Sequence, residues 1–345
     1  MNPFRFETAT SVDDALQQLA RPAAFGDTRV IAGGTNLLDL AKLHISQPTR
    51  LIDINALPLD EIAELPDGGL RLGATARNAD TAYHPQVRKR YPLLSAAMLA
   101  AASPQIRNMA SNGGNLLQRT RCAYFYDPGL PCNKREPGSG CPAIGGLTKY
   151  HAILGASEHC IATHPSDMCV ALAALDAVVV VASVRGQRHI PFVDFHRLPG
   201  DRPEIDTTLE ADELIVSIDL PDARAFAAHS VYLKIRERLS YAFALVSVAA
   251  ALDLDDTGRI HQARIALGGV AHKPWRDPSA EATLIGAACD DDAFARAADV
   301  LLDGAVSQGQ NAFKIPLARR VIVRALQTAA AGTLDNGARG AAELP

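Results

Sequence analysis

The sequence has no long uninterrupted apolar stretch, so nothing in it predicts a membrane-spanning helix. Such a helix needs roughly 18 or more consecutive apolar residues, and even the apolar run from Val170 to Ala182 is broken by Asp176. The first residues, MNPFRFETATSVDDAL, are polar and lack the apolar core of a signal peptide. We therefore expect no membrane insertion and no signal peptide in this chain.

An excess of positive charge is also missing. The 345 residues include 34 Lys and Arg against 38 Asp and Glu, for a net charge of −4, whereas nucleic-acid binders usually present a basic face. Aromatic residues make up only 5%, so aliphatic side chains should dominate the core. We expect no nucleic-acid partner, and a chain of this length predicts two or three α/β units.

Several familiar motifs are absent too. No Gly-Lys pair occurs, which excludes a Walker A loop, and no Gly-x-Gly-x-x-Gly follows a predicted strand. Residues 138–143 match Gly-x-Gly-x-x-Ala formally, but they follow no strand and contain a proline. The Gly-x-Ser-x-Gly turn of many hydrolases is missing as well.

Periodicity and turn residues predict mixed helices and strands. Ser11 followed by Asp14 is typical of a helix N-terminus. Residues 103–165 are rich in Gly, Pro, Asn and Cys and are too long for an idle loop, so a function or a bound cofactor should organise them. The predicted helices are 12–19, 36–43, 87–102, 167–175, 292–302 and 317–331, and the predicted strands are 28–32, 51–54, 69–76, 177–182, 213–220, 230–235 and 260–267, with an unassigned apolar segment at 241–252.

Three turns could contact a phosphate or a sugar. The first, residues 31–37, joins a predicted strand to a helix and contains a Gly-Gly pair, which allows close backbone approach to an anion. The second is the Gly-Gly-Asn turn of residues 111–115, and the third is Ser166-Asp167 at a predicted helix start. Each turn alone also fits plain turn or capping chemistry, but three together favour a long nucleotide cofactor.

Four of the six cysteines lie in the irregular region, with the spacing C-x9-C-x8-C-x18-C: Cys122, Cys132, Cys141 and Cys160. The close C-x2–4-C pairs of structural zinc are missing, and four thiolates could ligate a [4Fe–4S] cluster. Zinc and unliganded thiols stay open as alternatives. His151, His159 and His164 lie nearby, although loop histidines are more often solvated than metal-bound. Cys169 fits a small core residue.

The ordered set of turns resembles the FAD subunit of the xanthine dehydrogenase/aldehyde oxidoreductase family. A C-terminal Lys-x-Arg-x-Arg-x-Ser-Tyr-Ala-Phe-Ala segment from Lys234 follows in the same order. The resemblance implies an α+β fold, with a two-subdomain FAD-binding fold of the vanillyl-alcohol oxidase/p-cresol methylhydroxylase type and a C-terminal α/β domain. The expected units are residues 1–57, 58–224 with an insertion at about 118–162, 225–332, and a disordered tail at 333–345.

The cysteine insertion is similar to one in the flavin subunit of bacterial periplasmic aldehyde oxidoreductases, where it holds a [4Fe–4S] cluster. A related insertion occurs in 4-hydroxybenzoyl-CoA reductase. The resemblance therefore implies that Cys122, Cys132, Cys141 and Cys160 ligate such a cluster near the flavin.

The resemblance also implies roles for the turns. The segment Ile31, Ala32, Gly33, Gly34, Thr35, Asn36 and Leu37 should hold the FAD pyrophosphate. Ser111, Gly114 and Asn115 should contact the diphosphate and ribityl region, and Ser166 with Asp167 the adenosine side. Ile215 or Leu214 should pack near the isoalloxazine ring, with Lys234 at its polar edge.

In this family, a molybdopterin large subunit oxidises the substrate and a small subunit with [2Fe–2S] clusters passes electrons to FAD. This chain would then deliver electrons to an external acceptor, as part of an aldehyde oxidoreductase or of a xanthine dehydrogenase- or hydroxybenzoyl-CoA reductase-type enzyme. A self-sufficient flavin oxidase and a zinc-binding assembly module are the alternatives. The resemblance favours the periplasm, reached by co-export with a partner subunit, and the lack of a signal peptide fits the cytoplasm.

Overall fold

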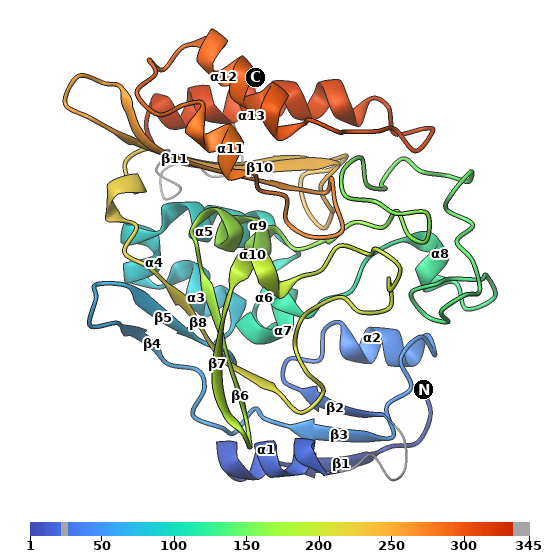
Figure 1. The fold of residues 1–345 in the computed structure, drawn as a ribbon. Coiled ribbons are helices and arrows are strands. Elements are labelled where there is room, and N and C mark those ends of the chain that lie inside the picture. The colour runs from blue at the N-terminus through green and yellow to red at the C-terminus, as the bar shows by residue number, and fades with distance from the viewer. Residues whose placement is uncertain (22–26, 334–345) are drawn as a thin grey trace.

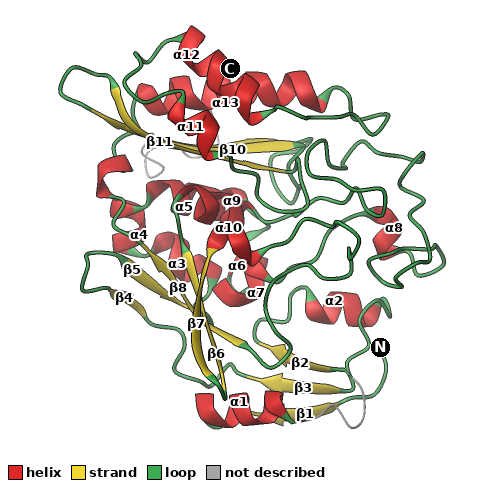
Figure 2. Cartoon of the chain, viewed as in Figure 1, coloured by secondary structure: helices red, strands yellow, loops and turns green. Residues whose placement is uncertain are grey.

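A computed structural model describes residues 1–21 and 27–333 of the chain (Figures 1 and 2). The chain forms sheets of three, five and three strands together with helices, which confirms the expected α+β class. Within these residues no helix has the length and apolar character needed to cross a membrane. The disorder expected for the tail at 333–345 falls, apart from Thr333, outside the described residues.

The first unit is a small parallel sheet with strand order β1-β3-β2. Ser11 caps its first helix by accepting a 3.0 Å hydrogen bond from the Asp14 N–H, as predicted, while the Asp14 carboxylate accepts from the Thr10 N–H at 2.8 Å. The elements are β1 (Arg5–Thr8), α1 (Val12–Ala20), β2 (Thr28–Ile31), α2 (Leu37–Lys42) and β3 (Arg50–Asp53).

The second unit is a five-stranded antiparallel sheet with helices on one face (Figure 1). The single helix predicted at 87–102 is wrong: α4 ends at Arg90 and α5 starts at Pro92, because proline lacks the N–H and clashes inside a helix. The elements are β4 (Ile62–Glu64), β5 (Leu70–Gly73), α3 (Asn78–Tyr83), α4 (Pro85–Arg90), α5 (Pro92–Ala100), α6 (Pro104–Arg107), α7 (Asn112–Leu116), α8 (Ala123–Tyr126), α9 (Asp167–Ala174), β6 (Val178–Ser183), β7 (Gly186–Pro191), α10 (Phe192–Phe195), β8 (Leu214–Leu220) and η1 (Arg224–Phe226).

The third unit is an antiparallel sheet with order β11-β10-β9, and it lies between two layers of helices (Figure 1). On β10, Val248 and Ala250 pack into the cluster that contains α12 and α13, whereas Ala249 and Ala251 pack toward α5 and α9. This alternation follows from the two-residue period of a strand. The elements are β9 (Ser230–Ile235), β10 (Val246–Leu254), β11 (Ile260–Gly268), α11 (Pro278–Ala282), α12 (Asp291–Leu301) and α13 (Lys314–Ala330).

The irregular region crosses from the second unit to the other two. All of residues 127–166 are described, and none of them lies in a helix or strand. Figure 1 shows this segment beside α2 and below the third unit, where the N–H groups of Ile153 and Leu154 donate to the Val270 carbonyl at 2.9 and 3.0 Å. The unit limits predicted at 57/58 and 224/225 fall between the sheets, and this division into units stays a prediction.

Candidate functional site

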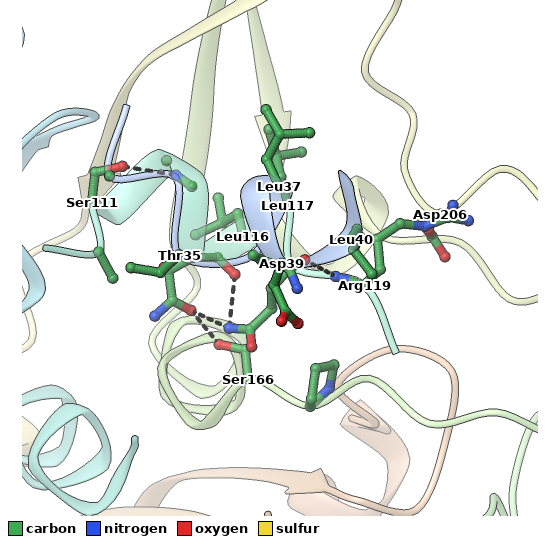
Figure 3. Close-up of a pocket in the computed structure, with 18 of the residues that line it drawn as sticks. Thr35, Leu37, Asp39, Leu40, Ser111, Leu116, Leu117, Arg119, Ser166 and Asp206 are labelled. Atoms are coloured by element: carbon green, nitrogen blue, oxygen red, sulfur yellow. Dashed lines mark hydrogen bonds and ion pairs between the residues drawn. The ribbon is translucent and has the colours of Figure 1, made fainter. Parts of the chain in front are cut away.

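A cavity of about 1100 Å³ opens between the first unit and the other two. Its size is that of a site for a large ligand, since ligand pockets commonly measure roughly 300–1,000 Å³. Every residue proposed from sequence to contact the cofactor lines this cavity: Ile31, Ala32, Gly33, Gly34, Thr35, Asn36, Leu37, Ser111, Gly114, Asn115, Ser166, Asp167, Ile215 and Lys234. Figure 3 shows residues of all three turns around it.

The first turn lines the cavity and carries a row of free backbone donors. Among the described residues, the N–H groups of residues 33–37 donate to no protein acceptor. Gly34 has φ +69°, a left-handed conformation that glycine adopts without strain. Consecutive free amides of this kind form a concave anion-binding surface, and the helix that follows, α2, has only six residues.

The reason why position 33 requires glycine differs from the expected one. A Cβ atom there would lie 2.0 Å from the Met109 carbonyl oxygen, so the backbones of residues 33 and 109–110 are in direct contact. This contact joins the first unit to the second. The expectation that both glycines leave room for an anion is therefore corrected for Gly33, whose missing side chain makes room for another loop.

The second turn is held by a buried network of asparagines. Ser111 caps α7 by accepting a 3.3 Å hydrogen bond from the Gly114 N–H. The Asn115 side chain donates to the Asn78 amide oxygen at 2.8 Å and accepts from the Ser166 hydroxyl at 2.5 Å. The second and third turns are thus bonded to each other. Asn78 supports them and belongs to no motif by which it could have been selected.

The third turn leads into a buried ion pair. Ser166 caps α9 by accepting from the Cys169 N–H at 3.1 Å, which confirms the predicted helix start. The Asp167 carboxylate accepts from the Tyr232 hydroxyl at 2.6 Å and from Lys234 Nζ at 2.8 Å. Burial, together with the Asp167 charge, raises the pKa of Tyr232 well above its usual value.

This contact bears on two of the expected roles. Asp167 was assigned to the adenosine side of FAD and Lys234 to the edge of the isoalloxazine ring, yet their side chains touch. The two residues cannot serve opposite ends of an extended cofactor, so one of these assignments must change.

Ile215 on β8 is 4% exposed and lies beside Gly113 of the second turn.

The insertion contacts the first turn directly. The Arg119 N–H donates to the Asn36 side-chain oxygen at 3.0 Å, and Tyr126 contacts Asn36 and Asp39 at 3.5 and 3.4 Å. Below these contacts, Phe125 is completely buried and packs in a small cluster with Leu40 of α2 and with Cys132. The cysteine-bearing segment therefore forms part of the cavity wall.

The segments that carry Cys132, Cys141 and Cys160 are tied together by the Asn133 side chain. Asn133, which follows Cys132, accepts from the Gly140 N–H at 2.8 Å and donates to the His159 carbonyl at 2.9 Å. Gly140 and His159 immediately precede Cys141 and Cys160. The Cys122 Sγ lies 3.1 Å from His151 Nε2. The irregular sequence is thus folded so that the four cysteines are near one another.

The thiols occupy a partly desolvated site. Burial raises the pKa of Cys122 to about 11 and that of Cys160 to about 12, and negative charge on neighbouring cysteines acts in the same direction. In the described chain, the one group of three or more His, Cys, Asp or Glu residues whose ligand atoms all lie within 4.8 Å of one another is His164, Cys169 and His196. The four insertion sulfurs are therefore too widely spaced for a single tetrahedral zinc ion, whose Zn–S bonds are about 2.3 Å.

A buried polar cluster on the cavity wall was not foreseen. Asp206 pairs with Arg119 at 2.7 Å and also binds the buried ammonium of Lys134, which lies 2.8 Å from His272 Nε2. Burial alone would raise the Asp206 pKa, but the nearby cations of Lys134 and Arg119 hold it well below its usual value. These residues are far apart in the sequence and share no motif that could have revealed the cluster.

Known families match nearly the whole chain. Residues 2–223 match the family described as FAD binding domain in molybdopterin dehydrogenase, and residues 231–329 match the CO dehydrogenase flavoprotein C-terminal domain. The aldehyde oxidoreductase FAD-binding subunit PaoB of Escherichia coli K12 is 49% identical over 333 residues, which cover 96% of this chain and 99% of that protein. The glyceraldehyde dehydrogenase medium chain of Sulfolobus acidocaldarius is 27% identical over 84% of this chain and 83% of its own.

Solved structures agree with these matches. Carbon monoxide dehydrogenase from Hydrogenophaga pseudoflava contains a chain that is 27% identical with a TM-score of 0.74, covering 96% of this chain and 98% of its own. A chain of quinoline 2-oxidoreductase from Pseudomonas putida 86 is 26% identical with a TM-score of 0.71, covering 96% of this chain and 98% of its own. The chain belongs to the family of FAD-binding medium subunits of molybdenum hydroxylases. The expected FAD-binding fold with a C-terminal domain is thereby confirmed.

Proposed function

We propose that this chain is the electron-transferring FAD subunit of a molybdenum-dependent aldehyde oxidoreductase. Its partners would be a large subunit that carries molybdopterin and a small subunit that carries [2Fe–2S] clusters, with electrons leaving through FAD to an external acceptor. The observation that carries this proposal is the 49% identity to PaoB along nearly the full length of both chains. A flavin supplies the capacity to accept and release electrons, and the protein holds it and controls access to it.

The free amides of residues 33–37 fit the FAD diphosphate, because these residues line the cavity and their N–H groups have no acceptor among the described residues. We assign Asp167 and Lys234 together to the flavin end, since their ion pair keeps them in contact. There the lysine ammonium would favour negative charge on the ring edge. Ser111, Gly114, Asn115 and Ser166 would then line the middle of the cofactor.

We also propose that Cys122, Cys132, Cys141 and Cys160 hold a [4Fe–4S] cluster. A four-iron cluster binds each thiolate to a different iron and so accepts wider sulfur spacing than one ion does. The shared contacts through Asn133 and the half-buried to buried state of all four thiols support such a site. The insertion also contacts Asn36 of the first turn, which would bring the cluster close to the flavin.

Export is the remaining part of the proposal. The resemblance to periplasmic aldehyde oxidoreductases favours assembly with a partner that carries the export signal. Fractionation of cells that express the complete complex would test this. Recovery of the complex with cytoplasmic markers would favour the alternative location.

Quantification of the cofactors tests the proposal most directly. The complex is purified anaerobically, and flavin, iron and sulfide are measured per chain beside the visible spectrum. We expect one flavin, and about four iron and four sulfide beyond those of the [2Fe–2S] partner. Cys141→Ser should lower the iron content, whereas Cys289→Ser, the matched control outside the insertion, should not.

Each alternative predicts a different result. Flavin without the additional iron would refute the cluster and leave the flavin subunit standing. Zinc in place of iron with no flavin would indicate an assembly module. Aldehyde oxidation by the isolated chain would indicate a self-sufficient flavin oxidase.

A further inference from the structure

The thiol of Cys122 has a buried histidine beside it. His151 Nε2 lies 3.1 Å from the Cys122 Sγ, and the histidine is 5% exposed. Its other ring nitrogen, Nδ1, is also buried and has no hydrogen-bond partner in the described part of the chain. Within the described residues, the cysteine sulfur is therefore the one hydrogen-bond partner of the ring.

This arrangement decides which nitrogen carries the proton. A proton on Nδ1 of the neutral ring would place an N–H group in the interior without an acceptor, which is unfavourable. A proton on Nε2 points at the sulfur. In this favoured neutral tautomer, the sulfur of Cys122 receives a hydrogen bond.

The C-terminal unit holds the main chain of His151 in place. The His151 carbonyl accepts hydrogen bonds from Lys314 Nζ at 2.8 Å and from the Asn311 amide at 3.1 Å, and both of these residues are fully buried. The His151 N–H donates to the Thr148 carbonyl at 2.9 Å. The ring also lies against Tyr124, with centroids 6.2 Å apart. These contacts hold the segment that carries His151 beside Cys122.

We infer that His151 donates an Nε2–H···S hydrogen bond to the Cys122 thiolate and thereby raises the reduction potential of the cluster. The inference rests on the proposed [4Fe–4S] site. A hydrogen bond to a ligating sulfur stabilises the more negative, reduced form, and such bonds are among the factors that set cluster potentials. His151 acts through Cys122, so it is a positioning residue that lets the C-terminal unit tune the cluster.

A redox titration of the purified complex, followed by EPR, tests this role. The four-iron centre is read at low temperature, where its fast spin relaxation separates it from two-iron centres. We expect His151→Ala to keep its iron and to shift the midpoint potential to a more negative value. His151→Gln, whose amide can donate to sulfur, should recover part of the shift, and His189→Ala on the exposed strand β7 should leave the potential unchanged.

Nitrogen hyperfine coupling gives a readout that packing alone would not change. In complex labelled with ¹⁵N-histidine, the reduced cluster should show a weak histidine coupling that His151→Ala removes. An unchanged potential at full iron content would overturn the inference. Loss of iron in both His151 variants, with flavin retained, would also overturn it, because His151 would then be a ligand.

Two further outcomes complete the test. If the alanine variant alone loses iron, the coupling in the wild-type complex decides: its presence supports the hydrogen bond and its absence refutes it. A wild-type complex without the four additional irons refutes the proposed cluster and this inference together. That result is recognisable from the iron content before any variant is made.

Discussion

Breaking the Lys234–Asp167 ion pair should destabilise the protein far more than breaking an ion pair on its surface. The two side chains are 3% and 6% exposed, and their charged atoms are 2.8 Å apart. Lys234→Met removes the ammonium and leaves the Asp167 carboxylate in the interior with the Tyr232 hydroxyl as a donor. Loss of one member of a buried pair costs about 3–5 kcal/mol, because the remaining charge stays out of water.

Thermal unfolding at saturating FAD provides the assay. Since 1 kcal/mol corresponds to about 2–4 °C for units of 150–250 residues, Lys234→Met should lower the melting temperature by about 6–20 °C. The matched control is Lys149→Met, which breaks a pair with Glu237 in which both side chains are nearly half exposed. Surface pairs contribute about 0–1 kcal/mol, so this control should lose only a few degrees.

A double variant separates the buried charge from other effects of the substitution. Lys234→Met with Asp167→Leu replaces the pair by apolar groups and removes the uncompensated carboxylate. It should melt at a higher temperature than Lys234→Met alone. The reasoning is refuted if the double variant is no more stable than the single one, or if Lys234→Met and the Lys149→Met control lose equal stability.

Three other perturbations test the remaining parts of the site. Gly33→Ala places a Cβ atom 2.0 Å from the Met109 oxygen, so it should lower the free energy of unfolding by about 1–3 kcal/mol and reduce the bound flavin. The control Gly129→Ala, whose nearest contact is a side chain at 3.2 Å, should retain its flavin. Equal flavin content in the two variants would contradict this. Phe125→Ala should cost about 3–5 kcal/mol and lower the iron content, and an unchanged melting temperature would refute the buried role of this ring. The free energy of unfolding should fall as the pH drops from 6.5 toward 4, because burial lowers the pKa of His196 to about 4 and the unfolded chain is protonated first. His196→Gln should remove up to about 1.4 kcal/mol per pH unit from that slope. Identical slopes for both proteins in denaturant titrations would exclude this role of His196.

Helices and strands that carry a local sequence pattern, such as a capping serine or an alternation of apolar and polar residues, were predictable. Strands without such a pattern were not. The N-terminal residues of α1 and α9 were recognisable from Ser11 and Ser166, whose hydroxyls accept backbone N–H groups three residues ahead. Strand β7 was missed because it lies at a sheet edge with mostly polar, exposed residues and so lacks an alternating pattern. Strand β10 was seen only as an apolar segment, since burial on both faces removes the alternation that identifies a strand.

The site shows the same division. The glycine and serine turns could be selected from sequence because each is a contiguous motif with its own backbone chemistry. The Asp167–Lys234 contact joins residues 67 positions apart, and the Lys134–Asp206 contact joins residues 72 apart. A single sequence contains no signal for such pairs, because their meeting depends on how the sheets and the insertion pack together.

The 2.5 Å hydrogen bond between Asn115 and Ser166 closes the insertion at its base, because these residues are 51 positions apart and flank it on either side. The intervening segment is therefore a closed loop, and its two ends lie side by side in the wall of the flavin cavity. Closing a loop ten times longer costs only about 2 kcal/mol more, since each doubling costs about 0.6 kcal/mol. The second and third turns therefore stay bonded to each other independently of the segment between them, which we propose to bind the cluster.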